Sequence, residues 1–236
     1  MSNQKKILLG LTTTPGSDWR DKIQEIDALG LKELAGFPTF LGRSRRKEFY
    51  ALLEKTCLEK MPHVHLRDDM EEGEVEYFIR RWKTEVFNIH PYPNFKKFLL
   101  GQSFKKIIFV ENHNRLSKDF FEMLNLCGGI CLDFAHWKVR ENNRRKGYEN
   151  FGKCLKENKI GCCHISAVRK KWGFFWTDDH HFESLADFDY LLPWRGYLPS
   201  IISLELENSL AEQLKVKAYL ENKIINSSEE SFEKKG

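Results

Sequence analysis

The alternation of short apolar runs with helical segments constrains the fold of this 236-residue chain more than any other feature. The apolar runs have the length of β-strands and are mostly bounded by glycine, proline or polar residues. The predicted strands are Lys6–Thr12, Leu31–Phe37, Pro62–Leu66, Val86–His90, Ile107–Glu111, Ile130–Phe134, Ile160–Ile165 and Ile201–Glu205.

Apolar residues recur with helical spacing between these runs, and Ser117 and Ser209 stand where each could cap a helix. The predicted helices are Ser17–Leu29, Arg43–Lys60, Glu74–Trp82, Phe95–Leu100, Lys118–Leu126, Tyr148–Glu157, Leu185–Leu192 and Leu210–Glu221. Parallel strands need crossovers that cover the sheet, so eight alternating units predict an α/β fold, a (β/α)8 TIM barrel. A doubly wound open sheet is the rival. Its dinucleotide-binding form is disfavoured because residues 12–17 lack a Gly-x-Gly-x-x-Gly motif.

Composition is compatible with one large domain. With 41% hydrophobic residues and 18 phenylalanines, the chain can bury a substantial core. We expect the barrel to occupy residues 1–225 and the polar residues 226–236 to form a disordered tail. No apolar run is long enough for a signal peptide core or a membrane span, which predicts a cytoplasmic protein with no membrane partner. The six cysteines show no paired spacing and are expected to be reduced.

Histidines and carboxylates gather at the carboxyl ends of the predicted strands. In a parallel barrel these ends share one rim, where barrel enzymes hold their active sites. Imidazole and carboxylate side chains together are common ligands of divalent metal ions. The rim is expected to carry His63, His65, His90, Glu111, His113, Asp133, His136, His164, Glu205 and Glu207, and the loop after the seventh strand adds Asp178, Asp179, His180 and His181.

These strand ends resemble the xylose isomerase-like divalent-metal barrel superfamily, which includes sugar isomerases, epimerases and endonuclease IV. The resemblance covers roughly residues 6–220 and is sharpest at residues 110–112, 131–136, 163–165 and 203–205. It implies one divalent ion, manganese, magnesium or zinc. The implied metal ligands are Glu111, Asp133, His164 and Glu205, with Glu207 as an alternative at the last strand.

The leading functional hypothesis is a metal-dependent isomerase or epimerase of a small sugar or sugar phosphate. An ion in this site would stabilise an enediolate while a carboxylate removes the carbon-bound proton, and Glu111 with Glu205 could form the acid and base pair. The resemblance to the epimerases implies substrate contacts by His136 and Arg169. Oligomeric state is left open.

The alternative hypothesis is a zinc phosphodiesterase that acts on abasic DNA. The resemblance to endonuclease IV implies further metal ligands at His65, His90, Asp179 and His181, and His136 would then bind metal rather than substrate. A third hypothesis is a noncatalytic ligand-binding barrel. Basic and aromatic side chains near the rim could bind a sugar phosphate or a nucleic acid. These candidates are Arg43, Arg45, Arg169, Trp172 and Trp176.

Overall fold

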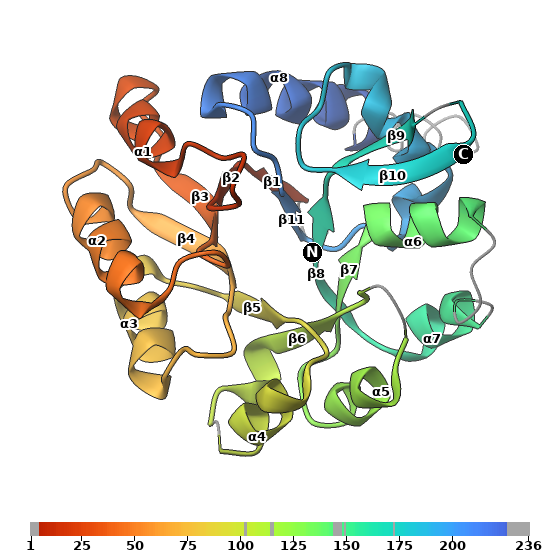
Figure 1. Ribbon diagram of the computed structural model, residues 1–236, viewed down its shortest axis with the longest axis horizontal. Helices are drawn as coiled ribbons and strands as arrows, with labels where there is room; N and C mark the ends of the chain where they lie inside the picture. Colours follow the sequence, from red (N-terminus) through yellow and green to blue (C-terminus); the bar gives the residue numbers. More distant parts are fainter. Residues whose placement is uncertain are drawn as a thin grey trace, which may run out of the picture.

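A sheet of nine parallel strands forms the centre of the computed structural model, which describes residues 5–101, 103–113, 116–143, 148, 150–171 and 173–225. The strand order is β1-β11-β8-β7-β6-β5-β4-β3-β2. The bounds are β1 Lys6–Leu8, β2 Gly10–Thr12, β3 Glu33–Phe37, β4 Lys60–His65, β5 Val86–Ile89, β6 Ile108–Glu111, β7 Ile130–Asp133, β8 Ile160–Ile165 and β11 Ile201–Leu204. The edge strands β1 and β2 are separated along the chain by Leu9 alone, so the sheet curls into a nearly closed barrel (Figure 1).

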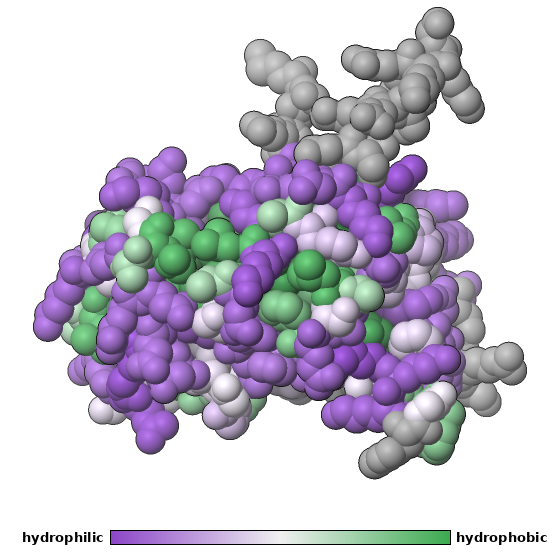
Figure 2. All heavy atoms as spheres, turned by 90° about the horizontal axis from the view of Figure 1, so that it is seen from above, coloured by the Kyte–Doolittle hydropathy of each residue, from purple (hydrophilic) through white to green (hydrophobic). Residues whose placement is uncertain are grey.

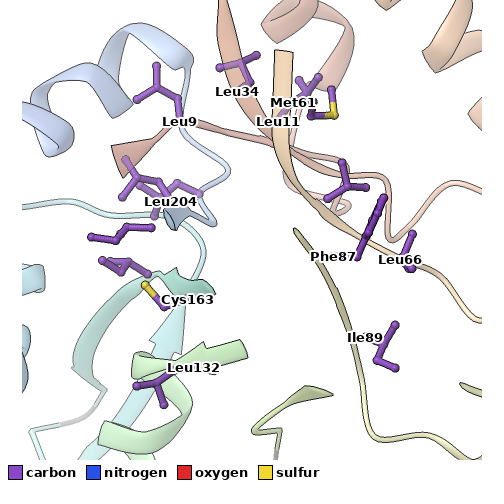
Figure 3. Packing of buried hydrophobic residues seen from close by; sticks show 14 of the residues in the cluster. Leu9, Leu11, Leu34, Met61, Leu66, Phe87, Ile89, Leu132, Cys163 and Leu204 are labelled. Carbon is purple, nitrogen blue, oxygen red and sulfur yellow. The ribbon is translucent and has the colours of Figure 1, made fainter. Parts of the chain in front are cut away.

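Helices surround the strands (Figure 1). The α-helices are α1 Trp19–Ala28, α2 Arg43–Leu53, α3 Glu72–Trp82, α4 Pro93–Gly101, α5 Lys118–Leu124, α6 Phe134–Asn142, α7 Phe151–Glu157 and α8 Leu210–Leu220. Two 3-10 helices, η1 Lys105–Ile107 and η2 Leu185–Tyr197, and the π-helical η3 Glu221–Ile225 complete the set in the described part of the chain. Outward-facing strand residues pack against the helices in the larger core, of which Figure 3 shows Leu9, Leu11, Leu34 and Met61. Figure 2 shows a surface on which hydrophilic side chains surround smaller hydrophobic patches.

A second apolar layer fills the interior of the barrel. Its members alternate along the strands with those of the outer core, as the two-residue period of a strand requires. They are Leu8, Ala35, Phe37, Val86, Phe109, Cys131, Cys162 and Ile201. Gly161 is required here, because a Cβ atom at this position would lie 2.1 Å from the Phe109 ring. This layer supports the polar side chains at the carboxyl ends of the strands.

The sheet does not close between β2 and β11, and a side chain bridges this gap, which we call the seam. A Cβ atom on Gly10 would lie 1.8 Å from the carbonyl oxygen of Leu204, so only glycine allows the two strands to approach this closely. The Gly10 N–H donates to Gln213 Oε1 at 2.7 Å, and Gln213 Nε2 donates to the Gly10 carbonyl at 3.0 Å. Gln213, on α8, is completely buried. Its amide therefore takes the hydrogen-bonding place of a neighbouring strand.

Each of the eight predicted strands overlaps a strand of the structure, and the barrel-like α/β fold is confirmed. The first prediction, Lys6–Thr12, is interrupted at Leu9, and helix α2 ends at Leu53, earlier than expected. Sequence reasoning missed α6, which follows β7 directly, and the hairpin of β9 Ala167–Lys171 and β10 Phe175–Asp179. All six cysteines are free. Within the described ranges, no helix has both the length and the apolarity to span a bilayer. The expected tail lies outside the described residues.

Candidate metal centre

Glu111, the last residue of β6, lies at the centre of the polar cluster at the carboxyl ends of the strands. Its carboxylate is 2% exposed. Oε2 lies 3.2 Å from His65 Nε2 and 3.4 Å from His164 Nδ1, and Oε1 lies 3.5 Å from His90 Nε2. Asn88 Nδ2 donates to Oε2 at 2.7 Å and fixes the orientation of the carboxylate. Strands β4, β5 and β8 thus bring polar side chains to the one carboxylate at the end of β6.

Asp133 and His136 are brought together by the start of a helix. Asp133 ends β7 and is the N-cap of α6, and its Oδ1 accepts a hydrogen bond from the His136 backbone N–H at 2.7 Å. The turn that follows returns the His136 ring to the strand end, where Nδ1 lies 3.6 Å from Asp133 Oδ2 and 3.8 Å from Glu111 Oε1. The three-residue spacing in the sequence is therefore the spacing of a capped helical turn.

His164 and Glu205 complete the opposite side of the cluster. His164 Nδ1 lies 3.3 Å from Glu205 Oε2. His164 is fully buried, yet neither of its ring nitrogens makes a hydrogen bond of normal geometry within the described part of the chain. Buried polar atoms are nearly always bonded, so these two nitrogens beside two carboxylates could accommodate a further partner such as a cation.

The hairpin β9–β10 contributes Asp178 and His180, one residue earlier than the predicted pair. Asp178 Oδ2 lies 3.1 Å from His136 Nε2, and His180 Nδ1 lies 3.0 Å from the Glu205 carbonyl. Asp179 instead pairs with Arg169 and accepts from the backbone of His181, whose side chain is exposed. Asp179 and His181 therefore do not join the cluster in this structure.

Three of the imidazoles share an orientation that suits metal binding. Their Nδ1 atoms face backbone carbonyls, with distances of 2.9 Å from His65 to Leu66 and 3.1 Å from His136 to Asn112, besides the His180 contact. A proton on Nδ1 satisfies each carbonyl and leaves Nε2 as the ligand atom. His65 Nε2 also lies only 3.3 Å from His90 Nε2. A direct hydrogen bond between them needs a proton on one of the two nitrogens, and a cation between them could take the place of that proton.

Three groups of ligand atoms overlap within this cluster. They are His65 with His90 and Glu111, Glu111 with Asp133 and His136, and Asp133 with His164 and Glu205, and within each group the atoms lie within 4.8 Å of one another. Glu111 and Asp133 each belong to two groups. The residues therefore fit divalent cations, and the shared carboxylates fit more than one.

Charges within the cluster perturb the pKa values of its members. Burial alone would raise the pKa of Glu111, but the imidazoles of His90 and His164 outweigh burial and hold it well below its usual range. Burial would lower the pKa of His164, but Glu111 and Glu205 raise it to about 9. Burial raises the pKa of Asp133 to about 6. Protons therefore partly neutralise the carboxylates, and a bound cation would displace them.

The remaining predicted residues lie apart from this cluster. Glu207 faces Gly16, where a Cβ atom would lie 2.2 Å from its Oε2. Arg169 pairs with Asp179 and Glu183 rather than pointing freely into the site. Arg43 and Arg45 are exposed at the start of α2, and Arg43 pairs with Glu71 at 2.9 Å. Trp176 is partly buried and lies under Lys170. Trp172 lies outside the described residues.

Sequence reasoning missed the role of Asn88, and it selected Asp179 with His181 in the loop where the structure brings Asp178 and His180 to the cluster. Asn88 stands in the middle of β5, where an asparagine inside an apolar strand was the available signal. His113 was placed at the rim, and its ring centroid lies 4.8 Å from that of His90 and 5.1 Å from that of His136. Burial lowers its pKa to about 4, so it is a neutral neighbour of the cluster.

Comparison with known proteins supports the fold alone. The chain is similar to a crystal structure of an uncharacterised protein from Parabacteroides distasonis, with a TM-score of 0.51 and 15% sequence identity over 94% of this chain and 99% of that chain. Neither the protein-family models nor the curated proteins gave a match.

Proposed function

We propose that this chain is a metal-dependent phosphodiester hydrolase that acts on nucleic acid, similar to the endonuclease IV branch of the superfamily it resembles. The observation that carries the proposal is the overlap of the three ligand groups at Glu111 and Asp133. Carboxylates that bridge neighbouring ions are characteristic of clusters that clamp both oxygens of a phosphodiester displacement. We also infer that β1 and β2 are one strand interrupted at Leu9, which gives the barrel eight strands.

Each candidate ion position corresponds to one of these ligand groups. His65, His90 and Glu111 would hold the first ion, Glu111, Asp133 and His136 the second, and Asp133, His164 and Glu205 the third, with Asp178 adding a carboxylate beside His136. Because imidazole is present in all three sets, zinc fits them better than magnesium. Bound ions would supply an activated water and neutralise the leaving oxygen.

The protein's own groups orient these ligands. The carbonyls of Leu66 and Asn112 hold the rings of His65 and His136, and the Asn88 amide holds Glu111. Such outer contacts fix the tautomer and direction of each ligand. The exposed Arg45 near the rim and the formal net charge of +4 are compatible with a polyanionic substrate.

Substitutions of two adjacent aspartates, Asp178 inside the cluster and Asp179 outside it, test the proposal. Asp178→Asn should lower the zinc content of the purified protein and its nicking of abasic duplex DNA, because Asp178 contacts His136 in the cluster. Asp179→Asn is the control, because Asp179 pairs with Arg169 outside the cluster. Equal zinc content and equal nicking in the two variants would refute the proposed ligand set, and absence of nicking in a fully zinc-loaded protein would refute the activity.

Sugar isomerisation or epimerisation, the leading hypothesis from the sequence, is the second candidate. Glu111, Asp133, His164 and Glu205 could by themselves hold one ion, which is what that chemistry needs. It leaves His65, His90, His136, Asp178 and His180 without a catalytic role. One bound ion per chain together with turnover in a panel of sugars and sugar phosphates would favour this function over the hydrolase.

A further inference from the structure

A second group of metal-binding side chains lies inside the barrel, deeper than the candidate metal centre. His63, Cys131 and Cys162 each offer one ligand atom, and these atoms lie within 4.8 Å of one another. All three residues are completely buried. Cys131 on β7 and Cys162 on β8 are direct partners in the sheet, whereas His63 comes from β4. Each cysteine lies two residues before a member of the metal centre and therefore faces the same side of its strand.

The chemistry of this group differs from that of the rim. Two sulfurs and one imidazole form a soft ligand set, which suits zinc and other thiophilic ions better than magnesium or manganese. Two thiolates, a neutral imidazole and a divalent cation sum to zero charge. A neutral assembly is the form that can be buried between Phe37 and Phe109 without a large desolvation cost.

His63 is oriented as a ligand would be. Its Nε2 lies 3.1 Å from Asn88 Oδ1, and Asn88 uses its amide nitrogen to donate to Glu111. Asn88 Oδ1 is thus an acceptor, so the proton of His63 is on Nε2 and Nδ1 is the unprotonated nitrogen. Ser203 Oγ lies 2.7 Å from this Nδ1. The serine hydroxyl donates to Nδ1 in this arrangement, so an ion at Nδ1 would replace this hydrogen bond with Ser203 beside it.

We propose that His63, Cys131 and Cys162, with Ser203 beside them, bind one zinc ion inside the barrel, separate from the ions of the rim. Zinc bonds of about 2.3 Å to sulfur and about 2.0 Å to nitrogen require the three side chains to converge only slightly from their present positions. The ion would join β4, β7 and β8 beneath Glu111. Asn88 would connect the two sites, since it contacts both His63 and Glu111.

Cobalt substitution tests this site. Reduced, metal-depleted protein is titrated with Co²⁺ alone, and the near-ultraviolet charge-transfer band of thiolate-bound cobalt is recorded. The band should appear in the full chain and be lost in Cys131→Ser and in Cys162→Ser. Cys163→Ser is the matched control, because Cys163 is equally buried but belongs to the outer core on the other face of β8. It should keep the band.

Two results would overturn the proposal: absence of the band in the unmodified chain, or its survival in Cys162→Ser. Survival there would mean that Cys131 alone binds an ion together with Glu111 and His164, which also lie near it. If the serine variants do not fold, X-ray absorption of the zinc-loaded unmodified chain decides, because the proposal requires sulfur in the zinc coordination shell. Asp178→Asn should keep the cobalt band, so failure of the rim site and failure of this site are distinguishable.

Discussion

Replacement of Gln213 by leucine should destabilise the barrel at its seam. Besides its two bonds to Gly10, Gln213 Nε2 donates to the carbonyls of Asn208 at 2.9 Å and Leu206 at 3.3 Å. Leucine has a similar size but no polar atom. The change leaves a buried N–H and two buried carbonyls without their partner, while Leu206 keeps its bonds from Thr12 and Lys22.

The magnitude follows from the orphaned groups. A buried donor or acceptor left unbonded costs about 1–3 kcal/mol, and the apolar leucine recovers part of this, so we expect a loss of about 3–5 kcal/mol in the free energy of unfolding. Urea denaturation followed by circular dichroism measures it as a lower midpoint at unchanged slope. Gln24→Leu, at an exposed position of α1, is the control and should change stability by less than about 0.5 kcal/mol. A Gln213→Leu protein as stable as this control would refute the bridging role.

Three further predictions concern pH and packing. Burial would raise the pKa of Glu74, but the hydrogen bonds from Arg46 hold this pKa below its usual value. The stability that these bonds contribute is therefore present above the ordinary glutamate pKa and is lost as pH falls. The urea midpoint should fall less steeply with decreasing pH in Glu74→Gln than in the unmodified chain. Burial lowers the pKa of Lys22 from 10.5 to about 8. The free energy of unfolding should therefore rise by about 3 kcal/mol between pH 8 and pH 10.5, because the folded state releases the proton first. Profiles of stability against pH that run parallel in Lys22→Met and the unmodified chain would contradict this. Gly161→Ala should lower the melting temperature at a cost of about 1–3 kcal/mol, because the methyl group overlaps the Phe109 ring, and an unchanged temperature would argue against a filled interior.

The strands were predictable because their apolar runs are short, regularly interrupted and buried on both faces. In β6, for example, Ile108–Glu111 is wholly buried, and the sequence shows it as an apolar run that ends on a carboxylate. Parallel strands place their carboxyl ends together, so a rim that carries Glu111, Asp133, His164 and Glu205 was predictable from the strand ends. The choice of these four as ligands came from the resemblance to the superfamily.

The parts that sequence reasoning missed depend on local backbone geometry. Asp178 and Asp179 are adjacent, and only the antiparallel pairing of β10 with β9 decides which of them faces His136 and which faces Arg169. Strand residues alternate between faces, so an error of one position exchanges a ligand for a surface ion pair. The interior sulfur group was equally hidden, because Cys131 and Cys162 are neighbours only through the register of β7 and β8.

The interrupted first strand has a consequence for the order in which the chain can fold during synthesis. β1 pairs with β11, so Lys6 finds its strand partner at Ile201, whereas β2 pairs with the nearby β3. A nascent chain can assemble the sheet from β2 through β8 as its residues emerge. β1 and Gly10 must wait, because both β11 and Gln213 are made after the other strands. The edge of the sheet at β2 is thus exposed until α8 has left the ribosome, and closure of the barrel should follow assembly of the other strands.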